Sequence, residues 1–248
     1  MGATVSIPRA THAPRSRHSC ISTLTPRPDP AAPTTVENQA KLHLHQSPIA
    51  LPQLEPIPNT GCLQLQYGAG QARVSHDGPN IFIEWSGGDA SSLTLGDTTY
   101  RPIQFHFHTP SEHTICNVQF PLELHIVHAD TSGALAVLGF AFVYGDQDNT
   151  FLNLIWAHLP HLGANQGAID IGIIDGSNLV QPQDAFYRYA GSLTTPPFVE
   201  GVEWVMCQQP RSVSPKQVAT FFNAMQTANS RPLQPLNDRT VVLYGPTT

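Results

Sequence analysis

The chain has 248 residues, of which 40% are hydrophobic, and its 12 Lys and Arg against 18 Asp and Glu give a net charge of −6. That length and apolar content suffice for one sizeable core, whereas the acidic balance argues against nucleic-acid binding and against binding to an anionic membrane surface. The sequence has no run of 18 apolar residues that could span a membrane.

The amino-terminal segment differs in composition from the rest of the chain. Residues 1–45 contain no Trp, Tyr or Phe, are rich in Pro, Arg, Ser and Thr, and have no acidic residue before Asp29. Such a composition cannot bury enough apolar surface to order itself, so we expect a flexible tail over residues 1–40 and a single folded domain over residues 41–248. An organelle transit peptide, a myristoylation signal at Gly2 and a mis-assigned gene start remain open as interpretations of this tail.

The remaining sequence predicts a mainly β fold with a few short helices. Alternating or apolar runs bounded by Gly and Pro predict strands at Ile81 to Trp85, Ile103 to His108, Leu122 to His128, Ala134 to Tyr144, Val202 to Cys207 and Val241 to Tyr244.

Two segments carry the pattern of helices instead. Apolar residues recur at helical spacing from Asn149 to His158, until Pro160 ends the run. Ser214, Pro215 and Gln217 form a capping-box pattern ahead of a second apolar stripe.

Three histidines stand on two of the predicted strands. In QFHFHTPSEH, the residues Gln104, His106 and His108 alternate with two phenylalanines, so the polar side chains share one face. In PLELHIVH, Glu123 and His125 share a face in the same way. If the two strands pair antiparallel, the three imidazoles converge.

Convergent imidazoles are typical of a catalytic zinc site. Three neutral ligands leave the fourth position of a tetrahedral Zn²⁺ open for water, and the pKa of that water falls to about 7, which makes hydroxide available as a nucleophile near neutral pH. A ligating histidine also needs an acceptor for its other ring proton. Gln104 beside His106, and Glu123 beside His125, are suitably spaced for this role.

Two other interpretations fit parts of this pattern. A single strand histidine is more often a hydrogen-bonded core residue than a ligand, but a third histidine in phase with His106 and His108 favours a metal site. A run of the HxHxxxE type, which ends here at Glu112, also occurs in cupins. The glycines and the PxG element of the cupin signature are absent from this sequence.

Seven ordered segments resemble the α-class carbonic anhydrases, in the form found in bacteria, plants and fungi. They lie between residues 46 and 244 and read QSPIAL, YRPIQFHFHTPSEH, PLELHIVH, LAVLGF, YAGSLTTPP, VEWVM and NSRPLQPLNDR. The resemblance implies a large, twisted, mostly antiparallel central sheet flanked by short helices. It also implies a Zn²⁺ cofactor and the interconversion of carbon dioxide and bicarbonate by attack of zinc hydroxide, with side activity on small esters.

The resemblance assigns roles to individual residues around the zinc ion. It implies that His106, His108 and His125 bind the metal, and that Gln104 and Glu123 support two of these ligands.

A relay beside the metal is implied as well. By the resemblance, Thr194 accepts a hydrogen bond from the zinc hydroxide and donates its own proton to Glu112, while Thr195 lies at the edge of the substrate. Because a hydroxyl has one proton to donate, its commitment to Glu112 orients the hydroxide and excludes ligands that lack a proton.

Carbon dioxide is apolar and needs a dry wall rather than a hydrogen bond. The resemblance implies that five residues form this wall: Val127, Val137, Leu193, Val202 and Trp204. It also implies that His113 and His128 are buried, hydrogen-bonded structural residues and not metal ligands.

The sequence departs from the family at two functional positions. Pro79 stands where fast members carry the histidine that passes the proton to solvent, and proline cannot titrate. His76 substitutes for it only if its ring reaches the cavity; otherwise it is a solvated loop histidine. We therefore predict hydration that is limited by proton export. The aromatic WGY-type element that precedes QSPI in the family is also missing.

The cysteine pattern indicates a reduced protein. The four cysteines, Cys20, Cys62, Cys116 and Cys207, include no CxxC pair, and Phe198 stands where secreted members of the family carry one half of a disulfide. We therefore expect an intracellular, cytoplasmic protein, while organelle targeting, and secretion from a different amino terminus, remain open.

One alternative function stays beside the enzyme. The family includes zinc-less relatives that act as non-catalytic binding modules, and these lose a metal-ligand histidine. All three histidines are present here together with Thr194 and Glu112, so we predict a zinc-dependent enzyme with a small-molecule substrate, no nucleic-acid partner and an open oligomeric state.

Overall fold

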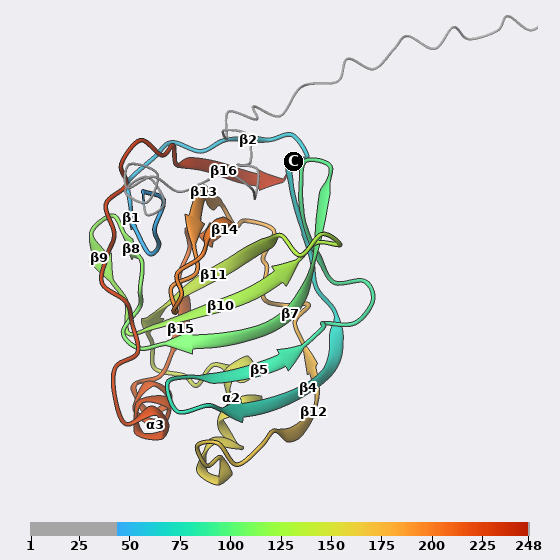
Figure 1. Ribbon diagram of the computed structural model, residues 1–248, viewed down its shortest axis with the longest axis vertical. Coiled ribbons are helices and arrows are strands. Elements are labelled where there is room, and N and C mark those ends of the chain that lie inside the picture. The colour runs from blue at the N-terminus through green and yellow to red at the C-terminus, as the bar shows by residue number, and fades with distance from the viewer. Residues whose placement is uncertain (1–43, 248) are drawn as a thin grey trace, which may run out of the picture.

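The computed structural model describes residues 44–247, so the predicted tail over residues 1–40 lies outside the described residues. Its main feature is a strongly twisted sheet that runs the length of the molecule (Figure 1). In spatial order its strands are β12 (Ile169–Asp175), β4 (Ala69–His76), β5 (Ile81–Trp85), β7 (Thr98–His108), β10 (Leu122–Ala129), β11 (Leu135–Tyr144), β14 (Glu200–Cys207), β13 (Phe186–Ser192), β16 (Val242–Thr247) and β2 (Ile57–Asn59). Most neighbours in this sheet are antiparallel, whereas β11 and β14, and β16 and β2, are parallel.

Six short strands complete the β structure. A small separate sheet consists of β1 (Ala50–Leu51), β8 (Thr114–Ile115) and β9 (Val118–Gln119). The strands β6 (Ser92–Leu95) and β3 (Leu63–Gln66) extend the sheet from β7, and β15 (Arg211–Val213) pairs with β11. Each of the six strands predicted from the sequence is present, so the mainly β, mostly antiparallel fold is confirmed.

The two predicted helices are also present, as α2 (Thr150–Trp156) and α3 (Pro215–Met225). The side chain of Asn149 accepts a hydrogen bond from the backbone N–H of Leu152 at the start of α2, and the capping box at Ser214 opens α3 as predicted. Pro160 lies in a short 3₁₀ helix, η1 (Leu159–His161), that follows α2. Within the described residues, neither helix is long and apolar enough to cross a bilayer.

The two faces of the sheet bury different side chains. The phenylalanines and leucines of β7 and β10, among them Phe105, Phe107 and Leu124, belong to a large apolar core that α2 and α3 cover (Figure 1). Each such fully buried side chain contributes about 1.5–3 kcal/mol to folding. A smaller apolar cluster that includes Val127 and Trp204 lies on the other face. The strand alternation therefore leaves the polar side chains of β7 and β10 on the face with the smaller cluster.

The state of the cysteines differs from the prediction. Among the described residues, Cys116 and Cys207 are free, but Cys62 is disulfide-bonded. The expectation of a fully reduced chain is therefore wrong, because pairing depends on proximity in space and not on a CxxC spacing. The cellular location stays a prediction.

Candidate metal centre

His106 and His125 lie directly opposite each other on the paired strands β7 and β10. The same ladder places His108 opposite Glu123, so the three histidines occupy two adjacent rows of one face. Their ring centroids are 4.6 to 5.3 Å apart. Antiparallel pairing at this register therefore brings the three imidazoles together, as the spacing predicted.

Each of these rings has one nitrogen bound to a protein acceptor. His106 Nδ1 lies 3.0 Å from Oε1 of Gln104, and His108 Nδ1 lies 3.0 Å from the backbone oxygen of Asn229. His125 uses its other nitrogen, because Nε2 is the atom that bonds to Oε1 of Glu123. These acceptors leave Nε2 of His106, Nε2 of His108 and Nδ1 of His125 without a fixed partner, and so define the tautomer of each ring.

The arrangement fits a zinc ion. The three histidines offer ligand atoms that all lie within 4.8 Å of one another, and Nε2 of His108 is a buried polar atom with no hydrogen-bond partner among the described residues. An unsatisfied buried nitrogen costs free energy, and a metal would remove that cost. Three imidazoles without a fourth protein ligand are the donor set of a catalytic zinc site.

Burial keeps these rings in the state that a metal requires. Burial lowers the pKa of His106 well below its usual value, and the nearby rings of His108 and His125 lower it further. Burial also lowers the pKa of His108, although the neighbouring carboxylate of Glu112 opposes this shift. Both rings are therefore neutral near pH 7, and a neutral imidazole is the form that binds zinc.

Glu123 is held by a chain of hydrogen bonds that reaches away from the metal side. Its Oε1 also lies 2.7 Å from Nδ1 of His113, and its Oε2 accepts the backbone N–H of His113 at 2.9 Å. His113 Nε2 lies 2.6 Å from the hydroxyl of Tyr189, which lies 3.0 Å from Oγ of Ser47. Burial alone would raise the pKa of Glu123, but the imidazoles of His113 and His125 and their hydrogen bonds lower it below its usual range. Glu123 is therefore an anion held in one orientation, and His113 is a structural residue, as predicted.

Glu112 lies next to the metal-facing atoms. Its Oε1 accepts the backbone N–H of Arg231 at 2.8 Å, and its Oε2 lies 3.9 Å from Nδ1 of His125. Oε2 is buried and has no hydrogen-bond partner among residues 44–247. Thr194 is buried as well. Among residues 44–247, however, no hydrogen bond links Thr194 to Glu112, so the predicted relay stays a prediction.

The residues predicted to form the apolar wall come together in one place. Val127, Val137 and Trp204 lie in a row across β10, β11 and β14, and Val202 and Leu193 belong to the same apolar cluster. The ring of Trp204 packs against His125 with centroids 4.8 Å apart. The metal-facing side of the sheet is therefore lined on one flank by apolar side chains.

Comparison with known proteins decides the family. The profile described as eukaryotic-type carbonic anhydrase matches residues 35–245. The chain belongs to the carbonic anhydrase family. It is 37% identical over 180 residues to a carbonic anhydrase of Klebsiella pneumoniae, an alignment that covers 73% of this chain and 72% of the relative.

Solved structures agree with this assignment. The α-carbonic anhydrase of Photobacterium profundum superposes with a TM-score of 0.71 at 34% identity, over 80% of this chain and 89% of the other. A dioscorin solved in complex with ascorbate superposes equally well, with a TM-score of 0.71 at 32% identity, over 82% of this chain and 86% of the other. The predicted resemblance to the α-class carbonic anhydrases is therefore confirmed.

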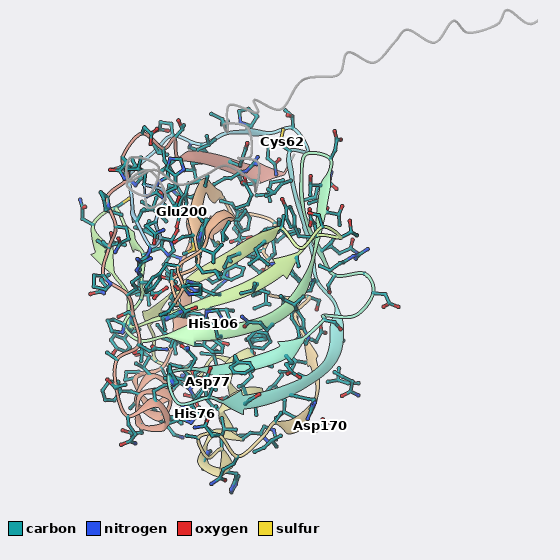
Figure 2. The ribbon with its side chains drawn as sticks, viewed as in Figure 1. Cys62, His76, Asp77, His106, Asp170 and Glu200 are labelled. Carbon is teal, nitrogen blue, oxygen red and sulfur yellow. The ribbon has the colours of Figure 1, made fainter. Side chains whose placement is uncertain are left out.

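The register of this carbonic anhydrase chain separates His76 from the metal side. Ser75 pairs with Phe82, which pairs with His106, so these three residues share one face. His76 pairs with Ile81 and points to the opposite face, and its Nε2 lies 3.2 Å from the backbone oxygen of Gly78 in the exposed turn. Figure 2 labels His76 beside Asp77 at the end of β4, away from His106 on β7. The geometry favours the solvated loop histidine over the proton carrier.

Sequence analysis missed two residues that complete this carbonic anhydrase site. Asn229 and Arg231 act on His108 and Glu112 through the backbone, and their segment was singled out only as part of the NSRPLQPLNDR motif. A backbone group carries no side-chain signature, so only the folded chain could reveal either contact. The predicted supports Gln104 and Glu123 do contact His106 and His125, and His128 is buried against the hydroxyl of Tyr67, as expected for a structural histidine.

Proposed function

We propose that this carbonic anhydrase family member is a zinc-dependent enzyme that interconverts carbon dioxide and bicarbonate. The observation that carries the proposal is the set of three convergent imidazole nitrogens, each left free because the other nitrogen of its ring has a protein acceptor. When bound there, zinc acts as a Lewis acid that makes a water-derived nucleophile available near neutral pH.

The chain supplies the geometry of the metal site. Gln104, Asn229 and Glu123 each accept a ring proton, so that His106 and His108 offer Nε2 while His125 offers Nδ1. Such hydrogen bonds raise the basicity of the ligands and hold their orientation. Because all three supports are already in place, little reorganisation is needed when the metal binds.

Thr194 and Glu112 orient the nucleophile. Oε2 of Glu112 is a buried acceptor without a partner, and an unsatisfied buried acceptor favours capture of any donor within reach. We infer that the hydroxyl of Thr194 donates to this oxygen. With its proton committed, Thr194 has only lone pairs left for the attacking oxygen, which aligns that oxygen with the substrate carbon.

The apolar flank binds carbon dioxide. Val127, Val137 and Trp204 offer no hydrogen bond to a ligand on this face, since the one indole N–H is already donated to the backbone oxygen of Ser192 at 2.9 Å. A dry surface suits a substrate without a dipole moment and excludes water from its place. Leu193 and Thr195 belong to the loop that follows β13, and we infer that they border the substrate.

Proton export limits the rate of this enzyme. Pro79 is exposed in the turn between β4 and β5 and cannot titrate, and His76 points to the other face of the sheet. The proton must therefore leave through water to an external acceptor. Proton transfer to small buffers depends on their concentration, so the turnover rate follows the buffer.

A non-catalytic binding module of the same fold is the alternative. Such a protein needs neither three free imidazole nitrogens nor an oriented carboxylate beside them, and both are present here. The enzyme is therefore favoured over the module.

Zinc content and hydration kinetics test the proposal together. The wild-type protein should bind one zinc per chain and hydrate carbon dioxide. His125→Ala should lose both properties, because the two histidines that remain hold zinc weakly. His161→Ala is the matched control, since His161 is exposed on η1. A zinc-loaded wild type without hydratase activity would establish the binding module instead.

A further inference from the structure

We propose that Arg231 is a positioning residue that clamps the threonine loop, residues 193–199, against Glu112. The inference rests on the proposed function, because it concerns the Thr194 and Glu112 pair. Arg231 lies between α3 and β16, far along the chain from both partners, and it contacts one partner through its backbone and the loop of the other through its side chain.

The backbone of Arg231 holds the carboxylate. Its N–H donates to Oε1 of Glu112 at 2.8 Å, and a charge-assisted bond of this kind fixes the orientation of the group. Oε2 is thereby turned to the side of His125 Nδ1, 3.9 Å away. One end of the clamp therefore sets where Glu112 presents its unpaired acceptor.

The side chain of Arg231 reaches the threonine loop directly. Its Cζ lies 3.8 Å from the centroid of the Phe198 ring, a stacking distance at which cation–π attraction is effective. The planar guanidinium also donates through Nη1 to Oε1 of Gln46 at 2.9 Å and to the backbone oxygen of Ser47 at 2.7 Å. Three directions are thus fixed by one rigid group, which a lysine could not match.

Gln46 forms the second arm of the clamp. Its Nε2 donates to the backbone oxygen of Phe198 at 3.1 Å and to Oε1 of Glu200 at 2.8 Å, and only 5% of the residue is exposed. Figure 2 labels Glu200 above His106 in the view. The guanidinium of Arg231 and the side-chain amide of Gln46 therefore both contact Phe198, near the end of the loop that carries Thr194.

The loop needs this support because of its own backbone. Phe198 has φ of +59°, a left-handed conformation that is costly for a bulky residue. Inside the loop, the N–H of Leu193 donates to the oxygen of Val199, and the N–H of Phe198 donates to the oxygen of Thr195, each at 2.9 Å. The internal bonds make the loop one compact unit, so that fixing Phe198 also fixes the position of Thr194.

Hydrogen exchange tests the clamp without reference to catalysis. In the zinc-bound protein, Arg231→Lys keeps the charge and the backbone N–H but loses the planar stack, and Phe198→Leu removes the ring. Each should speed amide exchange in residues 193–199 about tenfold, and the double variant should add little to Arg231→Lys alone because the stack on Phe198 is already lost in that variant. Arg73→Lys is the matched control, since Arg73 meets Glu84 only on the exposed surface.

Kinetics then separate positioning from simple support of the fold. With zinc content unchanged, kcat/KM for hydration should fall about tenfold in Arg231→Lys and in Phe198→Leu, and Phe198→Tyr, which keeps the ring, should restore both loop exchange and kcat/KM. Unchanged loop exchange in Arg231→Lys overturns the clamp, and faster exchange with unchanged kcat/KM overturns its positioning role. If the zinc-bound wild type does not hydrate carbon dioxide, the proposed function fails, and loop exchange alone decides the clamp.

Discussion

His106 and His125 face each other across the β7–β10 ladder, yet they are held by opposite ring nitrogens, Nδ1 in His106 and Nε2 in His125. The free nitrogens differ accordingly and still point to one centre. A shift of the pairing by one residue would turn every ligand of one strand to the core face. The metal site and the sheet register therefore depend on each other.

Replacing Glu123 by Gln should weaken zinc binding. Oε1 of Glu123 accepts from both His113 and His125, and an amide can satisfy these donors only in part, so His125 loses its fixed tautomer. We expect zinc affinity to fall about 10- to 100-fold, measured by competition with a chromophoric chelator. Glu84→Gln, which changes an exposed carboxylate of β5, should leave the affinity unchanged, and equal affinities in the two variants would refute the role of Glu123.

The hydration rate should rise with buffer concentration. At fixed pH and ionic strength, imidazole should increase kcat until another step limits it, because Pro79 cannot titrate and His76 points to the opposite face of the sheet. Pro79→His should raise kcat at low buffer and flatten the dependence, while His76→Ala should change neither. Stopped-flow kinetics that are insensitive to imidazole in the wild type would contradict the export limit.

Adding one methyl group at Gly191 should disturb the region behind the threonine loop. A Cβ there would lie 2.2 Å from Oγ of Ser47 and 2.8 Å from Cδ1 of Trp204, both on buried residues. We expect Gly191→Ala to lower the free energy of unfolding by about 1–3 kcal/mol, measured by urea denaturation. Gly245→Ala is the control, because its Cβ would meet atoms only at 3.5 Å and beyond; the same loss in both variants would show that the crowding is not the cause.

The stability of the protein should fall as the pH drops from neutral, in part because of His128. Burial lowers the pKa of His128 from its usual value of 6.5 to about 4, so between these values the unfolded chain binds a proton that the folded chain does not. The free energy of unfolding therefore decreases as the pH falls through this window. His128→Phe should reduce the slope of stability against pH between pH 6.5 and about 4 relative to the wild type. An identical slope in both proteins would argue against this titration.

Sequence patterns predicted the fold where one face of a strand is apolar and the other polar. The segments of β7 and β10 alternate clearly because one face meets the helices and the other meets the metal side. The edge strand β12 was not predicted, since it is exposed along much of its length and contains Gly172. The strand β13 was missed because its aromatic, charged and glycine residues follow no simple alternation.

The ligands of the candidate site were predictable from the sequence, but the contacts that distant segments make with these ligands were not. Side-chain type and the two-residue alternation of a strand identify His106, His108 and His125. The same signals identify Gln104 and Glu123. The acceptor for His108 is a backbone oxygen 121 residues away, and the N–H that holds Glu112 comes from Arg231, equally far along the chain. Such contacts are set by tertiary packing, which no local pattern encodes.

The late position of residues 229–231 in the chain has a consequence for biosynthesis. During translation, the hairpin-like pair of β7 and β10 leaves the ribosome about 100 residues before the segment that supplies the acceptor for His108 and the N–H for Glu112. A nascent chain can thus gather its three imidazoles early, but it can fix the ring of His108 and the carboxylate of Glu112 only when synthesis is nearly finished. Tight and selective metal capture therefore belongs to the finished polypeptide and not to the growing one.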